Sequence, residues 1–260
     1  MKRRRLVLGG GGTSGILAHA AALAQLRRRG VEVAALGGVS AGAVAAAAAA
    51  AGLDVEAVAL RLLASGAPLE HPAPSAYPYP CLYSGVGVRS ALGRLLPRQM
   101  GEVQTPLSLV AVNLSTRQQM IWDSRVHHAR SLPACVYASM AVPGVFPPAR
   151  VGDYLFVDGG LTSNVPAADI YGVHPDVLIL RVVRRAAPET PHGPAEYLAA
   201  LVDASIEHGT QSDLAGFGAE QVIELPITGD LVDFDVSRAR AASIMQAARA
   251  AVDAWADRWG

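Results

Sequence analysis

The chain has 260 residues, of which 51% are apolar and 17% are charged, and its 22 basic side chains balance its 22 acidic ones. This length and apolar content suffice for one large α/β domain with a buried core, so we expect a single domain over residues 1–260. A neutral net charge gives no general attraction to a polyanion, which excludes a nucleic-acid partner from our expectations.

The N-terminal residues and the cysteines bear on the compartment. A basic start at residues 1–5 resembles that of a signal peptide, but the apolar stretch after it, 6–8, runs into glycines after three residues. That stretch is too short for the apolar region of a signal peptide, so export is not expected. Two cysteines, Cys81 and Cys135, are too few for a disulfide framework in a chain of this size. These features favour a cytoplasmic protein.

Strand and helix patterns alternate through the first fifth of the chain. The apolar residues 6–8 indicate a strand, the glycines 9–12 end it, and apolar residues at helical spacing over 17–29 indicate a helix. Residues 31–36 then predict a second strand, and the alanine-rich 41–51 a second helix. Parallel strands need crossover connections, so this alternation predicts an α/β fold in which helices cover both faces of a mostly parallel sheet.

The remaining patterns place a loop, several strands and a final helix. Five prolines between positions 66 and 80 exclude a regular helix or strand there, so the region 66–100 is expected to hold a variable loop or lid. Alanine and arginine alternating with larger apolar residues predict a C-terminal helix over 237–260. The expected strands are 107–112 with a hairpin partner at 119–122, then 154–157 and 177–183.

The pentapeptide Gly38-Val39-Ser40-Ala41-Gly42 matches the G-x-S-x-G pattern of a nucleophile elbow and lies between a predicted strand and a predicted helix. A serine at such a turn has strained backbone geometry, which the small flanking residues Gly38 and Gly42 tolerate. Its hydroxyl is exposed at a helix N-terminus, which favours developing negative charge. Taken alone, the pattern fits tight packing of a strand-helix turn equally well, so other features decide.

A glycine-rich segment, GGGGTSG, follows the first predicted strand and can turn its backbone N–H groups toward one point. Such a loop can bind an oxyanion. It can also bind a pyrophosphate, because Gly10, Gly12 and Gly15 satisfy G-x-G-x-x-G. Dinucleotide binding further needs an acidic residue at the end of the second strand, whereas the nearby acid, Glu32, lies at its start. A dinucleotide-binding protein is therefore the lesser alternative.

A third motif, Asp158-Gly159-Gly160, follows the predicted strand 154–157. This spacing places a carboxylate at a strand end beside Gly159 and Gly160, which allow close approach of other groups. Asp158 is then able to accept the proton of Ser40 directly, although an ordinary aspartate is a weak base and needs burial to raise its pKa. An ordinary Asp-Gly turn is the alternative.

Four sequence blocks, taken together and in this order, resemble those of the patatin-like phospholipase family. The family usually carries Arg or Lys where this chain has Ser14, so a phospholipid is not assumed as the substrate. The blocks are GGGGTSG, GVSAG, the stretch ASMAVPGVFPP at 138–148, and DGG followed by Asn164-Val165-Pro166.

This resemblance implies a three-layer α/β/α sandwich and the activity of a serine acyl hydrolase. It also implies that residues 138–148 form a wall beside the nucleophile and that Asn164 helps to hold the Asp-Gly-Gly turn. The roles that it assigns are Ser40 as nucleophile, Asp158 as sole base, and Gly10, Gly11 and Gly12 as oxyanion hole.

Histidines offer an alternative to this Ser-Asp dyad. His174, His192 and His208 all follow Asp158 in the sequence, and the order Ser, Asp, His occurs in α/β-hydrolases. The elbow of those enzymes usually follows several strands, whereas here it follows the second, so the dyad is favoured. His19 is expected to pack within the first helix. No spacing of His, Cys or carboxylate residues suggests a metal site.

These inferences predict a serine acyl hydrolase that forms an acyl-serine intermediate and requires no cofactor. The expected substrate is a hydrophobic acyl ester or acyl thioester, and the Pro- and Tyr-rich loop at 66–80 leaves transient contact with a membrane or micelle open. Two alternatives stay open. One is an acyltransferase or thioesterase acting on thioesters of CoA or a carrier protein, and the other is a non-catalytic protein that binds a nucleotide or an acyl chain.

Overall fold

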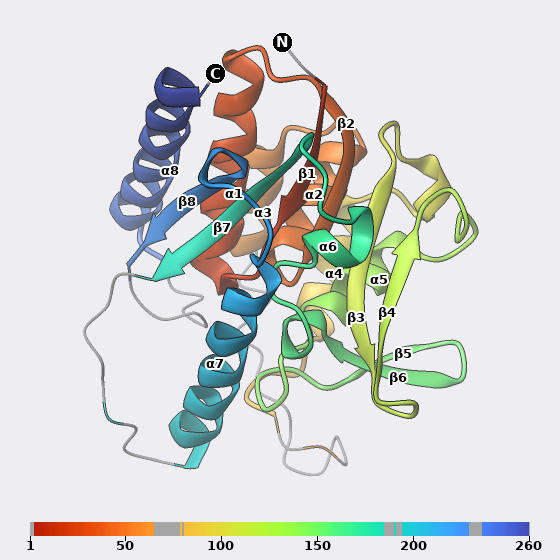
Figure 1. Cartoon of the computed structure of the whole chain (residues 1–260). Coiled ribbons are helices and arrows are strands. Elements are labelled where there is room, and N and C mark those ends of the chain that lie inside the picture. Colours follow the sequence, from red (N-terminus) through yellow and green to blue (C-terminus); the bar gives the residue numbers. More distant parts are fainter. Residues whose placement is uncertain are drawn as a thin grey trace.

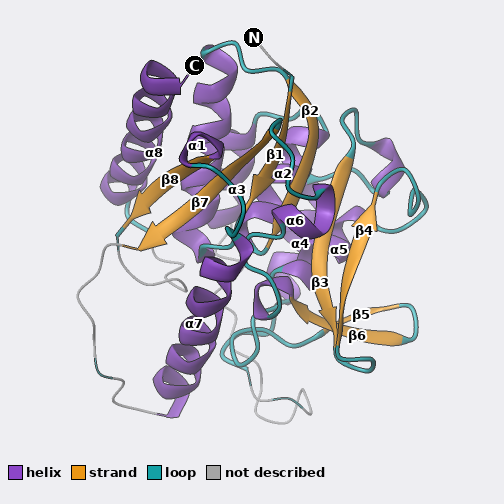
Figure 2. Ribbon diagram, in the orientation of Figure 1, coloured by secondary structure: helices purple, strands orange, loops and turns teal. Residues whose placement is uncertain are grey.

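A computed structural model describes residues 3–64, 79, 81–184, 190, 194–228 and 236–259. Figure 1 labels the helices and strands along the chain, and Figure 2 separates them by type. In chain order they are β1 (Arg4–Leu8), α1 (Gly12–Arg28), β2 (Val33–Val39), α2 (Ala41–Ala50), α3 (Val55–Ala64), α4 (Val86–Leu95), η2 (Met100–Glu102), β3 (Leu107–Asn113), β4 (Gln118–Asp123), α5 (Leu132–Ser139), β5 (Ala149–Val151), β6 (Tyr154–Asp158), η3 (Gly159–Leu161), α6 (Ala167–Tyr171), β7 (Val177–Arg184), α7 (Pro194–Asp213), η4 (Ala219–Gln221), β8 (Val222–Ile227) and α8 (Arg238–Trp259).

The described strands form one mixed sheet of eight, in the order β5-β6-β3-β2-β1-β7-β8, with β4 paired to β3. The five strands β3, β2, β1, β7 and β8 run parallel to one another, whereas β4 and β6 pair antiparallel with β3, and β5 pairs antiparallel with β6. Helices lie on both faces of this sheet (Figure 1). The expected three-layer α/β/α fold with a mostly parallel sheet is confirmed.

The two faces of the sheet bury different cores, as the alternation of side chains along a strand requires. In β1, Leu6 and Leu8 belong to a large core, which also takes side chains from α1 to α5 and from α8. Val7, between them, points to a smaller core that includes Ala167 of α6. Because residues 6–8 of β1 are buried on both faces, they form an unbroken apolar run rather than an alternating pattern.

The structure corrects two predicted boundaries near the glycines. The first helix begins at Gly12 instead of residue 17, so the glycine-rich loop is only 9–11. The second strand continues through Gly37 and Gly38 to Val39 instead of ending at residue 36. In both places packing and strand pairing outweigh the low propensity of glycine for regular structure.

Two further predicted regions are the loop or lid at 66–80 and the C-terminal helix. Most of the predicted loop or lid at 66–80 lies outside the described residues, and α4 occupies the part of 66–100 that follows it. A helix was expected over 237–260, and α8 is found at Arg238–Trp259, where it packs along α1 and its Asp253 accepts hydrogen bonds from Gln25 and Arg29, each at 2.6 Å. No helix in the described parts of the chain is both long enough and apolar enough to cross a membrane.

Candidate active site

Strand β2 passes directly into helix α2 at Ser40, which has a φ of 53° and a ψ of −122°. Residues other than glycine rarely adopt a positive φ, and such strain persists only where the surroundings impose it. A Cβ on Gly42 would overlap the backbone carbonyl of Leu8, and a Cβ on Gly38 would lie 2.6 Å from the carbonyl oxygen of Gly42. Glycine at both positions therefore lets β1, β2 and α2 pack closely around the strained serine.

The register of three strands brings Asp158 to Ser40. Strand β2 runs parallel to β3 and pairs Val39 with Val110, whereas β6 runs antiparallel to β3 and pairs Asp158 with Ala111. Strand β4 pairs with one edge of β3 along residues 108–113. Strands β2 and β6 therefore both pair with the other edge of β3, β2 as far as Val110 and β6 from Ala111 onward, and they meet end to end. The last residue of β6 thus lies beside the residue that follows β2.

The carboxyl group of Asp158 is buried, with only 1% of the residue exposed. Its Oδ1 accepts a hydrogen bond from the amide of Gly160 at 2.8 Å, and its Oδ2 has no partner of normal hydrogen-bond geometry among the described residues. Burial raises the pKa of Asp158 to about 6, although the hydroxyl of Ser40 and the amide of Gly160 act to lower it. The carboxylate is therefore a stronger base than in water, yet it stays deprotonated at neutral pH.

The amides of the glycine-rich loop are not equivalent. That of Gly10 donates to the backbone carbonyl of Asn164 at 3.1 Å and is not free to face a ligand. Those of Gly11 and Gly12 donate no hydrogen bond in the described part of the chain. As N-cap and first residue of α1, they lie at the positive end of that helix. Of the three amides expected to form an oxyanion hole, those of Gly11 and Gly12 are therefore free to donate to a ligand, and that of Gly10 is not.

Ser139, the last residue of α5, ties the nucleophile to the neighbouring strand. Its hydroxyl donates to the carbonyl of Val110 at 2.5 Å and accepts from the backbone amide of Ser40 at 3.1 Å. Two residues later, the carbonyl of Ala141 accepts from the amide of Asp158 at 3.0 Å. The segment 139–141 therefore holds the backbone at both Ser40 and Asp158. A wall beside the nucleophile is expected from the sequence over 138–148, but no local pattern marks Ser139, because its partners are distant in the sequence.

Asn164 joins the glycine-rich loop to helix α7. Its backbone carbonyl accepts from Gly10, and its side-chain Nδ2 donates to the hydroxyl of Thr210 at 3.0 Å. The amide of the next residue, Val165, donates to Asp213 at 2.9 Å. The Asp-Gly-Gly turn itself is closed by the hydrogen bond within it from Gly160 to Asp158. The contacts of Asn164 thus fix the loop against the last turns of α7.

The histidines of the alternative triad do not gather at Ser40. His174 precedes β7 and therefore lies at the opposite end of the parallel strands from Ser40, which follows β2. His208 is exposed on α7, and His192 lies outside the described residues. Within the described residues, no histidine makes a hydrogen bond to Ser40, and the dyad is the arrangement that the geometry favours.

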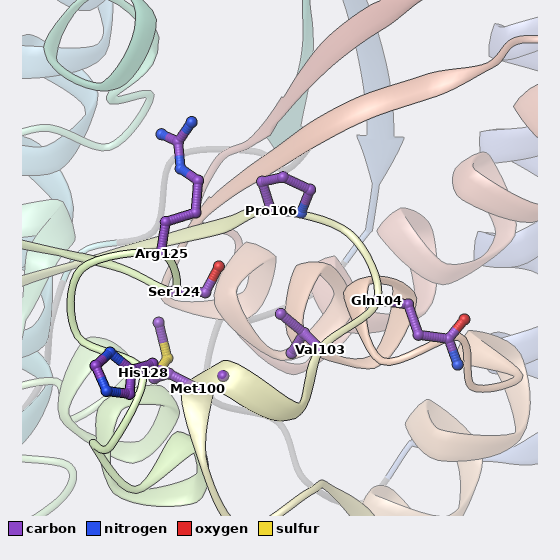
Figure 3. A pocket seen from close by; sticks show the side chains of 8 residues that line it. Met100, Val103, Gln104, Pro106, Ser124, Arg125 and His128 are labelled. Carbon is purple, nitrogen blue, oxygen red and sulfur yellow. The ribbon is translucent and has the colours of Figure 1, made fainter.

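A shallow pocket of about 340 Å³ lies at the far end of β3, around Pro106 and Ser124 (Figure 3). Two of its polar side chains are engaged with protein groups. The hydroxyl of Ser124 accepts from the amide of Leu107 at 3.0 Å, and Arg125 pairs with Asp123 at 2.6 Å. Since the pocket precedes β3 whereas Ser40 follows the parallel β2, it is separate from the candidate site.

Known proteins are similar to this chain over much of its length. The family model described as "Patatin-like phospholipase" matches residues 6–171, which include both Ser40 and Asp158. An "uncharacterized NTE family protein" of Mycobacterium tuberculosis is 31% identical over 168 residues, which make up 62% of this chain and 27% of that protein. The mouse "patatin-like phospholipase domain-containing protein 7" is 31% identical over 169 residues, which make up 62% of this chain and 12% of that protein.

The fold is shared with a solved structure. The crystal structure of VipD from Legionella pneumophila matches with a TM-score of 0.64 and 16% identity, over 99% of this chain and 67% of that one. The chain matches only about a quarter or less of the length of the two curated relatives named above. Because the family model covers more than half of the sequence, this chain belongs to the patatin-like phospholipase family.

Proposed function

We propose that the chain hydrolyses carboxylic esters of hydrophobic acyl groups through an acyl-serine intermediate, with Ser40 as nucleophile and Asp158 as general base. One observation carries the proposal. A serine held in a strained strand-helix turn lies beside a buried carboxyl group whose pKa is raised to about 6. A nucleophile and a base of suitable strength are thereby adjacent without a histidine. Membership of a family named for phospholipases supports the same reaction class.

The proposed reaction has two steps. In the first, Asp158 accepts the hydroxyl proton of Ser40 while Ser40 Oγ bonds to the ester carbonyl carbon. The carbonyl oxygen becomes an oxyanion that accepts hydrogen bonds from the amides of Gly11 and Gly12. The ester C–O bond then breaks, and Asp158 returns the proton to the departing alcohol. In the second step, water attacks the acyl-serine with Asp158 again as base, and the proton passes to the departing Ser40 oxygen.

The substrate that we propose is recognised by its acyl group. Ser14 occupies the position where the family usually carries Arg or Lys, and it is fully buried in the first turn of α1. It supplies neither a positive charge nor a surface contact to a phosphate head group. The segment that follows Ser139 is apolar, and its Met140 and Phe146 are buried. These features favour an apolar acyl chain over a charged head group as the part held next to the nucleophile.

A fluorophosphonate probe, which reacts with activated serine hydroxyls, tests the proposal. The wild-type protein is expected to gain the mass of one probe, and peptide mapping is expected to place it on Ser40. Hydrolysis of p-nitrophenyl butyrate should stop in parallel with labelling. Protein unfolded in guanidinium chloride, in which the dyad no longer exists, is the control and should remain unlabelled. The proposal fails if the folded protein is unlabelled and cleaves neither aryl esters, lysophospholipids nor acyl thioesters.

Replacing Ser139 with alanine is expected to lower kcat about 10- to 100-fold, because the amide of Ser40 loses its partner and the nucleophile shifts relative to Asp158. The buried carbonyl of Val110 also loses its donor, so the free energy of unfolding should fall by about 1–3 kcal/mol. Ester hydrolysis and guanidinium chloride unfolding measure the two effects.

The matched control is Cys135→Ala, which also removes one heavy atom from a fully buried side chain of α5. This variant is expected to lose stability and to keep the wild-type kcat. If Ser139→Ala also keeps the wild-type kcat within about twofold, Ser139 only stabilises the fold and does not position Ser40.

A further inference from the structure

His19 lies in the second turn of α1 and is completely buried. Its Nε2 is 2.8 Å from the backbone carbonyl oxygen of Gly9. Because a carbonyl oxygen only accepts hydrogen bonds, Nε2 carries the ring proton and Nδ1 is unprotonated. Within the described residues Nδ1 has no hydrogen-bond partner, and burial lowers the pKa of His19 to about 4. The ring is therefore a neutral donor with one function in the structure, the hydrogen bond to Gly9.

That hydrogen bond acts on a peptide group that is also held at its other end. The carbonyl of Gly9 and the amide of Gly10 belong to one planar peptide unit. His19 donates to its carbonyl, and the carbonyl of Asn164 accepts from its amide at 3.1 Å. The preceding amide, that of Gly9, donates to Leu180 of β7 at 3.1 Å. His19 and Asn164 thus hold this peptide plane from its two ends, and Leu180 holds the plane before it.

The fixed plane comes directly before the two free amides. Gly11 and Gly12 follow it, and glycines rotate about their backbone bonds more freely than other residues. A rotation of the plane between Gly9 and Gly10 would redirect the amide of Gly11, whose N–H group makes no hydrogen bond in the described structure. The amide of Gly12 shares its peptide plane with the carbonyl of Gly11, which accepts a hydrogen bond from the amide of Gly15 at 2.9 Å and is held by α1 itself. A donor that holds the carbonyl of Gly9 therefore determines where the amide of Gly11 points.

The choice of a histidine at this position has a cost in stability. The ring is completely buried on α1, whose neighbouring apolar residues belong to the large core, and a buried acceptor without a partner costs about 1–3 kcal/mol. An apolar residue of similar size would avoid that cost at a helix position facing a core. A histidine is expected at this position if its hydrogen bond to Gly9 fixes the geometry of the active site rather than stabilising α1.

We propose that His19 is a positioning residue that directs the amide of Gly11 at the oxyanion by holding the carbonyl of Gly9. This inference rests on the function proposed above. The residue does not touch the substrate and takes no part in proton transfer. Its effect is expected in the step where the oxyanion forms, and therefore in kcat and in the rate of reaction with a fluorophosphonate.

Two substitutions separate the hydrogen bond from the volume of the ring. His19→Gln keeps an N–H donor close to the place of Nε2, whereas His19→Met fills a similar volume without a donor. His19→Met is expected to lower kcat and the fluorophosphonate rate about 10- to 100-fold, part of the loss that follows removal of a whole oxyanion donor, with KM within about threefold of wild type. His19→Gln is expected to restore kcat to within about threefold of wild type.

Leu26→Met is the control for repacking, because Leu26 is buried on the same helix away from the loop and should tolerate the change without loss of kcat. Thermal unfolding establishes that each variant is folded. If His19→Met does not fold, His19→Asn replaces it, since the shorter amide does not reach Gly9 and should lose kcat as His19→Met does.

The outcomes separate the two proposals. A folded His19→Met with the wild-type kcat overturns the role of His19, as does a His19→Gln variant that loses as much kcat as His19→Met. In both cases wild-type labelling at Ser40 leaves the proposed hydrolase function intact. A wild-type protein that neither reacts with the probe nor cleaves esters overturns that function, and the role of His19 with it.

Discussion

Replacing Ser40 with alanine is expected to lower kcat/KM for p-nitrophenyl butyrate by on the order of 10⁴-fold or more. The change removes one oxygen atom from a residue that is only 8% exposed, so the fold should persist. Asp158 then has no hydroxyl to deprotonate, whereas the amides of Gly11 and Gly12 still bind the ester carbonyl. A residual rate above that of the uncatalysed reaction is therefore expected. Steady-state hydrolysis measures the loss, and near-ultraviolet circular dichroism checks the fold.

Two further variants test whether the loss of activity is specific to the hydroxyl group of Ser40. Ser108→Ala removes the hydroxyl of a buried serine on β3 that does not contact the dyad, and it should keep the wild-type kcat/KM. Ser40→Gly should be as inactive as Ser40→Ala but more stable than it by about 1 kcal/mol, because glycine adopts a φ of 53° without strain. If either substitution at Ser40 retained a tenth of the wild-type activity, the nucleophile would have to be another residue.

Local sequence patterns were sufficient to find the strands that lead to Ser40 and Asp158. Strand β3 is buried along its whole length and is apolar apart from Ser108 and Asn113, and residues 6–8 of β1 form an unbroken apolar run. The turn at Ser40 is marked by glycines that only close packing explains, and Asp158 ends an apolar strand. Strand β8 was missed because Glu224 and Pro226 interrupt its apolar residues.

The start of α1 could not be read from the glycines that form it. Glycine disfavours helices, so the pattern predicted a loop up to residue 16. In the structure a Cβ on Gly15 would lie 3.2 Å from the Cβ of Ala41, which shows that α1 approaches α2 closely at this point. The close approach of the helices selects glycine there, and this contact is absent from any local pattern.

The hydrogen bonds that support the site could not be predicted from local sequence patterns either. Ser139 is 99 residues from Ser40, and Asn164 reaches the amide of Gly10 from the other half of the chain. In the sequence, Ser139 and His19 look like ordinary polar residues of apolar helices. Their partners follow from strand register and helix packing, which single-sequence patterns do not contain.

Replacing Asp158 with asparagine is expected to lower kcat/KM by on the order of 10⁴-fold and to raise the free energy of unfolding at pH 8. Asparagine has nearly the same shape as aspartate but does not accept a proton from Ser40. A pKa that moves from 3.8 to about 6 on folding corresponds to at most about 3 kcal/mol. The folded protein binds more protons at this group than the unfolded chain between those values, so the wild-type stability falls as the pH rises through this window.

The stability of the variant should therefore depend on pH in a defined way. Above pH 6 the wild-type protein bears the full cost of a buried charge, and Asp158→Asn should be more stable by up to about 3 kcal/mol. Near pH 4 and below, the wild-type carboxyl is protonated in the folded state, so the difference should be small. Urea unfolding at pH 4 and pH 8 measures both values. A variant that is less stable than the wild type at pH 8 would contradict the cost assigned to burial.

Asp123→Asn is the matched control for this substitution. Hydrogen bonds and charge from Arg125 hold the pKa of Asp123 below its usual value, and the pair lies at the far end of β3 from the dyad. Removing that carboxylate should lower the stability and leave kcat/KM unchanged. The two aspartates are thus expected to respond with opposite signs in stability, and only Asp158→Asn should lose activity.

The pH dependence of the wild-type enzyme separates a base from a structural carboxylate. Only deprotonated Asp158 accepts the proton of Ser40, so kcat/KM should rise with pH through about 6 and level off above it. The residual activity of Asp158→Asn should show no inflection in that range. If the inflection persisted in the variant at the same pH, another group would be titrating, and the base would have to be assigned elsewhere. If Asp158→Asn lost both the inflection and most of the activity while its free energy of unfolding rose, the buried carboxylate that lowers the stability of the wild-type protein would be the same group that accepts the proton of Ser40.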